Sequence, residues 1–242
     1  MIKYLTAILI LTNLIFSGTL TGTVSYSGKA PKAKTVKMDA DPVCGKAHKD
    51  EVKSETFIVD ENNNLKNVLV WIEDVKTDIT GDKLEPAVID QKGCIYIPHV
   101  IGVMKNQEVL IKNSDPAMHN VHSMPVVNES FNFPMSKSTK VKNAVFKKSE
   151  EPFYIKCDVH PWMKSWVLVS DNPYFAVTDD NGNFTISDIP KGTYNVVFWQ
   201  ERLSNVDEKK YNKQNTTLSI TITEDGVTEQ NFIFDKPIKK AK

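Results

Sequence analysis

The sequence lacks an excess of charge of either sign. Its 242 residues include 30 Lys and Arg and 30 Asp and Glu, so the formal net charge is zero. No overall field therefore favours nucleic acid or an anionic membrane surface, and we expect no nucleic-acid partner. The short basic tail, residues 237–242, is interpreted as a solvated chain end. Internal repeats and low-complexity tracts are also missing.

Long apolar runs are missing beyond the first residues. Lys3, the apolar run 5–16 and the small residues Ser17 and Gly18 are typical of an export signal, which we place at residues 1–18. The run is shorter than the about 20 apolar residues of a membrane-spanning helix. We expect an exported protein, in the periplasm or at the cell surface, with no permanent membrane span after signal cleavage. An uncleaved N-terminal anchor is the alternative.

Cysteine and histidine are scarce. The three cysteines are Cys44, Cys94 and Cys157, and the chain has 5 His, too few for a multicopper oxidase. In an oxidising compartment, two of the three cysteines are expected to pair. The sequence does not fix the pairing, but Cys44 and Cys94 lack the metal-ligand neighbours found around Cys157. We therefore expect a disulfide between Cys44 and Cys94. The C-x2-C-H signature of c-type haem attachment is absent.

Helix signals are scarce as well, whereas short strand-like segments recur. Residues 19–27 alternate in polarity, and residues 66–72 form a β-branched run after the turn cluster 60–64. Many short strands separated by turn residues indicate an all-β sandwich or barrel. A boundary near residues 171–173 precedes a second set of strand-like segments, which predicts a small second β-sandwich at residues 171–236.

One loop combines three soft or nitrogen ligands. Cys157, His160 and Met163 follow one another at a spacing of three, and His119 lies at the end of a different predicted strand. Two His and one Cys with a weak axial Met are the ligand set of an electron-transfer copper site, and methionine is a poor ligand for zinc. His122 lies three residues past His119, on the opposite face of an extended segment, so we interpret it as a surface or neighbouring histidine.

Residues 92–170 resemble the plastocyanin/amicyanin-like cupredoxins in the order and spacing of their motifs. Residues 96–98, 103–109 and 119–122 look like the first half of a cupredoxin core, and the Cys-x2-His-x2-Met loop is similar to that of amicyanin. The resemblance implies one copper ion that cycles between Cu(I) and Cu(II). The implied ligands are His119, Cys157, His160 and Met163. It also implies that Asn120 orients the ligand loops by hydrogen bonds.

Three residues flank the implied ligands: Met118, Pro161 and Trp162. In the functional interpretation they form an apolar patch around a comparatively exposed His160, where a redox protein docks transiently through a small interface. Packing around the site is the alternative interpretation. The chain lacks the acidic patch that some plastocyanins use for docking, so the identity of a partner does not carry over.

The expected fold is a cupredoxin-like Greek-key sandwich at residues 19–170, with its core at 92–170, followed by the small sandwich at 171–236. We expect residues 19–91 to add strands to the first sandwich; a separate β-domain is the alternative. Residues 178–186 and 189–194 make the second unit similar to carboxypeptidase regulatory-like, transthyretin-like sandwiches. That resemblance is structural and implies no peptidase.

The sequence thus predicts an exported blue copper protein that carries single electrons and is not an enzyme. Two alternatives belong to other classes. One is a periplasmic copper-binding or delivery protein. The other is a cell-surface binding or adhesion protein with a vestigial metal site.

Overall fold

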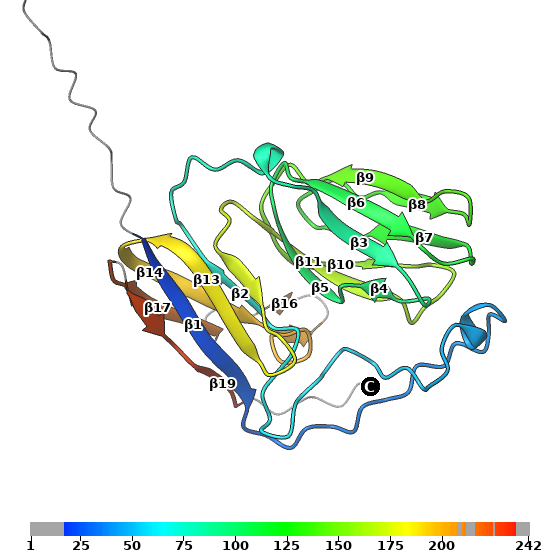
Figure 1. Cartoon of the computed structure of the whole chain (residues 1–242), viewed down its shortest axis with the longest axis horizontal. Coiled ribbons are helices and arrows are strands. Elements are labelled where there is room, and N and C mark those ends of the chain that lie inside the picture. Colours follow the sequence, from blue (N-terminus) through cyan, green and yellow to red (C-terminus); the bar gives the residue numbers. More distant parts are fainter. Residues whose placement is uncertain (1–16, 208–209, 212–215, 225, 236–242) are drawn as a thin grey trace, which may run out of the picture.

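The computed structural model describes residues 17–207, 210–211, 216–224 and 226–235. These residues form β-strands and two short 3₁₀ helices, η1 (Cys44–Lys46) and η2 (Gly81–Lys83) (Figure 1). The all-β prediction is confirmed. Among the described residues, no helix has the length and apolar character to cross a membrane. Residues 1–16 of the predicted signal and the tail 237–242 lie outside the described residues.

Strands from both ends of the described chain build one sandwich, here called the terminal sandwich. In its first sheet, β1 (Ser17–Tyr26) pairs with β13 (Asn183–Pro190), β18 (Val227–Glu229) and β19 (Phe232–Phe234). The second sheet has the order β12 (Phe175–Val177), β2 (Leu69–Ile72), β14 (Gly192–Trp199) and β17 (Thr217–Ile222). The buried residues Leu20 and Val24 of β1 share one core with Val70 and Phe198 of the facing sheet.

The second sandwich, here called the ligand sandwich, is a continuous stretch of chain between β2 and β12. Its two sheets have the orders β5-β11-β10-β7-β8 and β4-β3-β6-β9. Its strands are β3 (Ala87–Gln91), β4 (Tyr96–Ile97), β5 (Val100–Met104), β6 (Glu108–Asn113), β7 (His119–Ser123), β8 (Asn132–Met135), β9 (Val141–Val145), β10 (Glu150–Lys156) and β11 (Lys164–Ser170).

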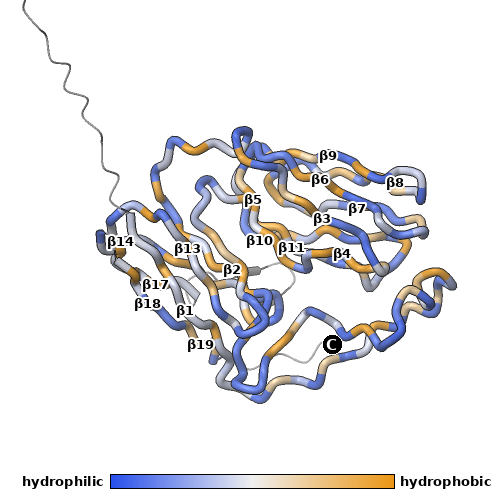
Figure 2. The backbone as a smooth tube through the Cα atoms, viewed as in Figure 1, coloured by the Kyte–Doolittle hydropathy of each residue, from blue (hydrophilic) through white to orange (hydrophobic). Residues whose placement is uncertain are grey.

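Burial alternates along the strands of the ligand sandwich, as expected where one face of each sheet meets a core. In β6, for example, Val109 and Ile111 are buried and their neighbours are not. Figure 2 shows hydrophobic and hydrophilic stretches alternating along the backbone of both sandwiches. The strand pairs β5–β11 and β3–β6 are parallel, and the other pairs of this sandwich are antiparallel. A short hairpin, β15 (Asn205–Asp207) with β16 (Lys210–Tyr211), stands apart from both sandwiches in its pairing.

The predicted role of residues 19–91 is wrong for most of that segment. Neither β1 nor β2 joins the ligand sandwich; both belong to the terminal sandwich. The sequence does not predict this pairing because the partners are far apart in the chain: Thr23 of β1 pairs with Asn183 of β13. Only β3 adds to the ligand sandwich, so this sandwich begins at Ala87 rather than at residue 92. The boundary predicted near residues 171–173 does fall between β11 and β12.

The two sandwiches pack on each other through an apolar interface. Its buried members are Leu69, Trp71, Val100, Leu168, Val197 and Trp199. Beside it, His99 of the ligand sandwich contacts Glu201, just after β14, with 2.8 Å between Nε2 and Oε2. Trp166 and Trp199 contact each other here, with their rings tilted at 59° and 4.8 Å between ring centroids.

The chain between β1 and β2 makes a long excursion with little regular structure (Figure 1). Within this excursion, an isolated antiparallel bridge joins Thr35 to Lys53, and we call residues 35–53 the cap segment. Met38 and Cys44 of this segment are buried in the core of the ligand sandwich rather than in that of the terminal sandwich. The excursion therefore connects the terminal sandwich to the end of the ligand sandwich that carries the predicted ligands.

Candidate metal centre

The predicted ligands lie at one end of the ligand sandwich because of how β7 and β10 pair. His119 is the first residue of β7, and Cys157 directly follows the last residue of β10. Antiparallel pairing of His122 with Lys156 brings the start of β7 beside the end of β10. The loop that joins β10 to β11 then contributes His160 and Met163.

Three of the four predicted ligands converge. The Nδ1 atoms of His119 and His160 lie 2.9 Å apart, and Cys157 Sγ lies 3.8 Å from His160 Nδ1. One ligand atom from each of these three residues lies within 4.8 Å of the ligand atoms of the other two. Separations of this size are those that a single ion spans with bonds of about 2.0–2.3 Å to nitrogen and sulfur. All three side chains are buried.

Met163 is held against this cluster by the loop backbone. Its carbonyl accepts a hydrogen bond from the Cys157 N–H at 3.2 Å, and its own N–H donates to the His160 carbonyl at 2.9 Å. Its side chain is buried in the same core as Cys157. These contacts hold Met163 on the same tight loop as Cys157 and His160.

A carboxylate holds the outer nitrogen of each histidine. Asp115 Oδ2 lies 2.9 Å from His119 Nε2, and Asp41 Oδ2 lies 3.2 Å from His160 Nε2. Asp115 is itself fixed by the backbone N–H groups of Gly93 at 2.6 Å and Cys94 at 2.8 Å. A carboxylate at Nε2 leaves Nδ1 as the ligand atom and raises the basicity of the ring, which is the common arrangement around metal-bound histidine.

The electrostatics of the cluster favour a charged pair. Burial lowers the pKa of His119, but hydrogen bonds to Asp115 and Cys157 outweigh it and raise the pKa from 6.5 to about 9. Burial raises the pKa of Cys157, but hydrogen bonds from His119 and the Asn120 N–H have the larger effect. The pKa of this thiol therefore lies below its ordinary value. The cluster thus stabilises the thiolate, which is the form of cysteine that binds metals.

Asn120 links the two ligand segments. Its Oδ1 accepts a hydrogen bond from the Asp158 N–H at 2.7 Å and lies 3.4 Å from Cys157 Sγ. Its backbone N–H points at the same sulfur at 3.5 Å, and its carbonyl accepts the Tyr96 hydroxyl at 2.7 Å. Burial is the main cause of a large rise in the pKa of the Tyr96 hydroxyl above its ordinary value. The hydroxyl therefore stays protonated and remains a donor.

The cap segment covers His160, and the expectation of a comparatively exposed His160 is wrong. Only 2% of this residue is exposed, because Asp41 and Cys44 lie against its ring. Cys44 Sγ is 3.7 Å from His160 Nε2. No local pattern predicts this cover, because Cys44 lies 116 residues before His160 in the chain.

The flanking residues differ in exposure. Met118 is 57% exposed and Pro161 is exposed, but Trp162 is half-buried and donates its ring N–H to the Cys94 carbonyl at 2.9 Å. Trp162 also stacks on His160, with 4.9 Å between ring centroids. This ring therefore packs on the site, whereas Met118 and Pro161 face solvent.

The remaining candidates occupy definite places. Cys44 and Cys94 form a disulfide, and Cys157 is a free, buried cysteine. His122 lies 2.9 Å from Asp158 through its Nδ1 and is not among the converging ligands. His48 in the cap segment contacts the Gly93 carbonyl through Nε2 at 2.6 Å.

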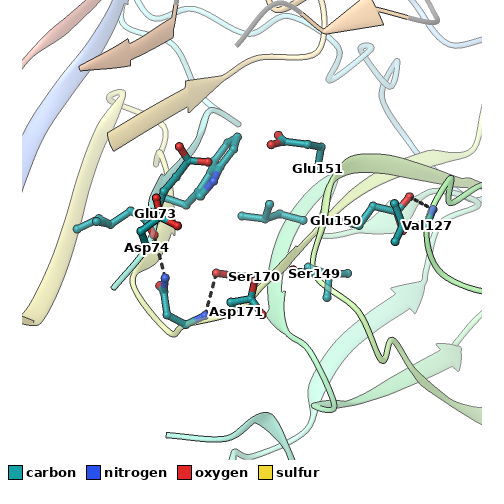
Figure 3. Close-up of a pocket in the computed structure, with 13 residues that line it drawn as sticks. Glu73, Asp74, Val127, Ser149, Glu150, Glu151, Ser170 and Asp171 are labelled. Atoms are coloured by element: carbon teal, nitrogen blue, oxygen red, sulfur yellow. Dashed lines mark hydrogen bonds between the residues drawn. The ribbon is translucent and has the colours of Figure 1, made fainter. Parts of the chain in front are cut away.

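A separate pocket of about 330 Å³ lies at the junction of the two sandwiches (Figure 3). Its lining is acidic and includes Glu73, Asp74, Glu150 and Asp171. Glu150 accepts hydrogen bonds from the backbone N–H groups of Val126, Val127 and Asn128, so it holds a loop in place. None of the predicted ligands lines this pocket.

The predicted site did not include Asp41 and Asp115, the partners of the two histidines. A signal existed for Asp115, which precedes His119 by four residues in a turn-forming segment. No local signal exists for Asp41, whose partner His160 is 119 residues away.

Among solved structures, the chain is similar to copper proteins over less than half of its length. A variant of amicyanin in the Cu(I) form is 19% identical, with a TM-score of 0.32, and the match covers 42% of this chain and 98% of that one. A purple cupredoxin from Nitrosopumilus maritimus is 24% identical, with a TM-score of 0.30, and the match covers 35% and 99%. At these identities the likenesses say nothing about function.

A copper-containing nitrite reductase from Thermus scotoductus is 18% identical, with a TM-score of 0.34, over 40% of this chain and 25% of that one. The family model described as polysaccharide lyase family 4, domain II, matches residues 137–230, which include parts of both sandwiches. No curated protein matches the chain. The carboxypeptidase regulatory-like resemblance is not what the family comparison finds, and it stays a prediction.

Proposed function

We propose that this chain is an exported type 1 copper protein that transfers single electrons between redox partners and catalyses no reaction of its own. Bound copper supplies the one-electron exchange between Cu(I) and Cu(II). The chain would hold it with His119, Cys157 and His160, and with Met163 as a weak fourth ligand.

One observation carries the proposal: Nδ1 of His119, Nδ1 of His160 and Cys157 Sγ face one another in a buried space. A thiolate with two imidazoles suits copper in both oxidation states, and it differs from the oxygen-rich sites that bind magnesium or calcium. The donor set present therefore fits copper.

The surroundings of the cluster favour fast electron exchange. Asp115 and Asp41 fix the two rings from behind, and Asn120 fixes the loop of Cys157. Ligands held this firmly change little in position when the charge of the ion changes. A small rearrangement on electron transfer is what a carrier needs, whereas an enzyme needs an open position for substrate, which this buried cluster does not offer.

The cap segment bears on the choice between carrier and delivery protein. The Cys44–Cys94 disulfide joins it to the turn before β4, directly beside Asp115. A delivery protein must release its ion readily, and a covalent tie across the site opposes release. We therefore favour the carrier over copper delivery or storage.

Voltammetry of the copper-loaded chain tests the proposal. We expect reversible one-electron reduction without loss of copper, and no such response from Cys157→Ser, which keeps the fold but lacks the thiolate. Copper that leaves on reduction, or that is lost quickly to a chelator in either oxidation state, would favour delivery. A folded chain that takes up no copper would favour the adhesion protein with a vestigial site.

For docking, we propose the exposed surface formed by Met118 and Pro161 on the ligand loops. An apolar surface of this kind suits a transient redox complex. Export and the role of the terminal sandwich as a spacer or docking module belong to the same proposal. Mixing Met118→Lys with a redox partner should slow electron transfer without changing the visible spectrum, because the exposed Met118 is not one of the proposed ligands.

A further inference from the structure

Sulfur atoms lie near both sides of the two histidine rings of the candidate centre. Their Nδ1 atoms face Cys157, and their Nε2 atoms face the cap segment and the turn at Gly93. Two further groups of potential ligand atoms lie there. They consist of Asp41, Cys44 and His160, and of Cys94, Asp115 and His119, each within 4.8 Å.

Cys44 and Cys94 connect these two groups. As a disulfide, their sulfur atoms bond to each other and are poor ligands. In the dithiol state, they would be two soft sulfur atoms directly beside the rings that bind the first ion. We propose that Cys44 and Cys94, as dithiol, form a second binding site for Cu(I), which adjoins the centre at His119 and His160 and lies on its cap side.

The dithiol state arises without any special chemistry, because the chain is synthesised with free thiols. Binding of Cu(I) releases the thiol protons and forms copper–sulfur bonds, with no change in oxidation state. Later formation of the disulfide removes two electrons from the two thiolates, whose protons left when the ion bound, and the electrons pass to a disulfide-forming oxidant. The S–S bond that forms withdraws both sulfurs from the ion.

Contacts other than the disulfide also hold the two cysteines near the histidine rings. Asp41 pairs with His160 and also accepts the N–H groups of Val43 at 2.7 Å and Cys44 at 3.1 Å. On the other side, Asp115 accepts the Cys94 N–H at 2.8 Å. Two metal–sulfur bonds of about 2.3 Å each require the sulfurs to separate by no more than about 4.6 Å. The exposed backbone of the cap segment can absorb that movement.

Copper(I) is the ion that this pair suits best. Thiolates are soft ligands, and two of them are sufficient for a soft monovalent ion. The position on the cap side puts this second site between the centre and the covering segment. An ion bound there would reach Cys157 past the two shared rings, and oxidation to the disulfide would then close the cap over it.

This inference goes beyond the proposed function, and its test is arranged to be independent of it. The full chain is reduced with a phosphine, freed of reductant under nitrogen and titrated with Cu(I) against a chromophoric Cu(I) chelator. A thiol assay on the same sample counts free cysteines. We expect two ions per chain in the dithiol state and one in the disulfide state.

Variants separate the two sites. Cys157→Ser removes the first site, and it should bind one ion as dithiol and none as disulfide. Cys44→Ala with Cys94→Ala should bind one ion whether or not it has been treated with phosphine. Asp41→Asn in the Cys157→Ser chain loosens the cap segment and should weaken Cu(I) binding by about tenfold.

The inference is overturned if the dithiol and disulfide forms of Cys157→Ser bind the same amount of Cu(I). It is also overturned if Asp41→Asn leaves the affinity unchanged, because the pair would then act as any two thiols do. Failure of the proposed function has a different signature: the disulfide form of the unaltered chain would bind no ion, whatever Cys157→Ser does.

Discussion

Removal of the Cys44–Cys94 disulfide should destabilise the protein by about 4 kcal/mol. The bond closes a loop with a sequence separation of 50, and the loss of chain entropy in the unfolded state for a loop of this length corresponds to about 4 kcal/mol at 25 °C. The loop includes β2 and β3, so it links the terminal sandwich, the cap segment and the ligand sandwich. Cys44→Ala with Cys94→Ala removes the bond and leaves no free thiol at the site.

Urea unfolding of the metal-free chain measures this effect, with tryptophan fluorescence and circular dichroism as two probes. For a chain of this size, 1 kcal/mol corresponds to about 2–4 °C, so the melting temperature should fall by about 8–16 °C. Cys157→Ala, which removes a thiol outside the disulfide, is the matched control for the loss of a buried sulfur. A difference below about 1 kcal/mol between the double variant and the unaltered chain would refute this reasoning.

Three further predictions concern the core, the pH dependence and the ligand surroundings. Leu20→Ala should cost about 2–5 kcal/mol in chemical unfolding, because Leu20 is fully buried between the two sheets of the terminal sandwich; an unchanged midpoint would show that β1 is not part of that core. Because the pKa of His119 is raised from 6.5 to about 9, its pair with Asp115 and Cys157 contributes stability that is complete below pH 6.5 and lost as the pH rises towards 9. Unfolding of the metal-free chain should show this loss, and His119→Gln should remove it; an identical pH profile in both would contradict the assignment. Asp115→Asn should weaken copper binding by about 10–100-fold in a chelator competition, and an unchanged affinity would mean that the carboxylate does not hold the ring.

Local patterns in the sequence were sufficient for the all-β class, because alternation of burial within a strand depends on neighbours two residues apart. The proximity of Cys157, His160 and Met163 in the chain is also a local feature, since one loop carries all three. The Cys44–Cys94 pairing was predicted because only Cys157 has potential metal ligands beside it in the sequence, and the structure contains this disulfide.

Contacts between segments far apart in the chain could not be predicted from the sequence. The alternation in β1 predicts a strand but not its partner, and its partner β13 lies about 160 residues away in the chain. The prediction of an exposed His160 failed for the same reason. Asp41 and Cys44, which cover this residue, are 119 and 116 residues away from it in the chain. Long-range packing of an irregular segment decides this feature, and periodicity carries no information on it.

Visible and electron paramagnetic resonance spectra of the copper-loaded chain, with the Cys44–Cys94 disulfide intact, test whether His119, Cys157 and His160 hold copper. We expect one copper per chain, an intense visible band from the Cys157 thiolate to Cu(II), and loss of that band in Cys157→Ser. Tightly bound copper without this band, or a band that persists in Cys157→Ser, would contradict this expectation.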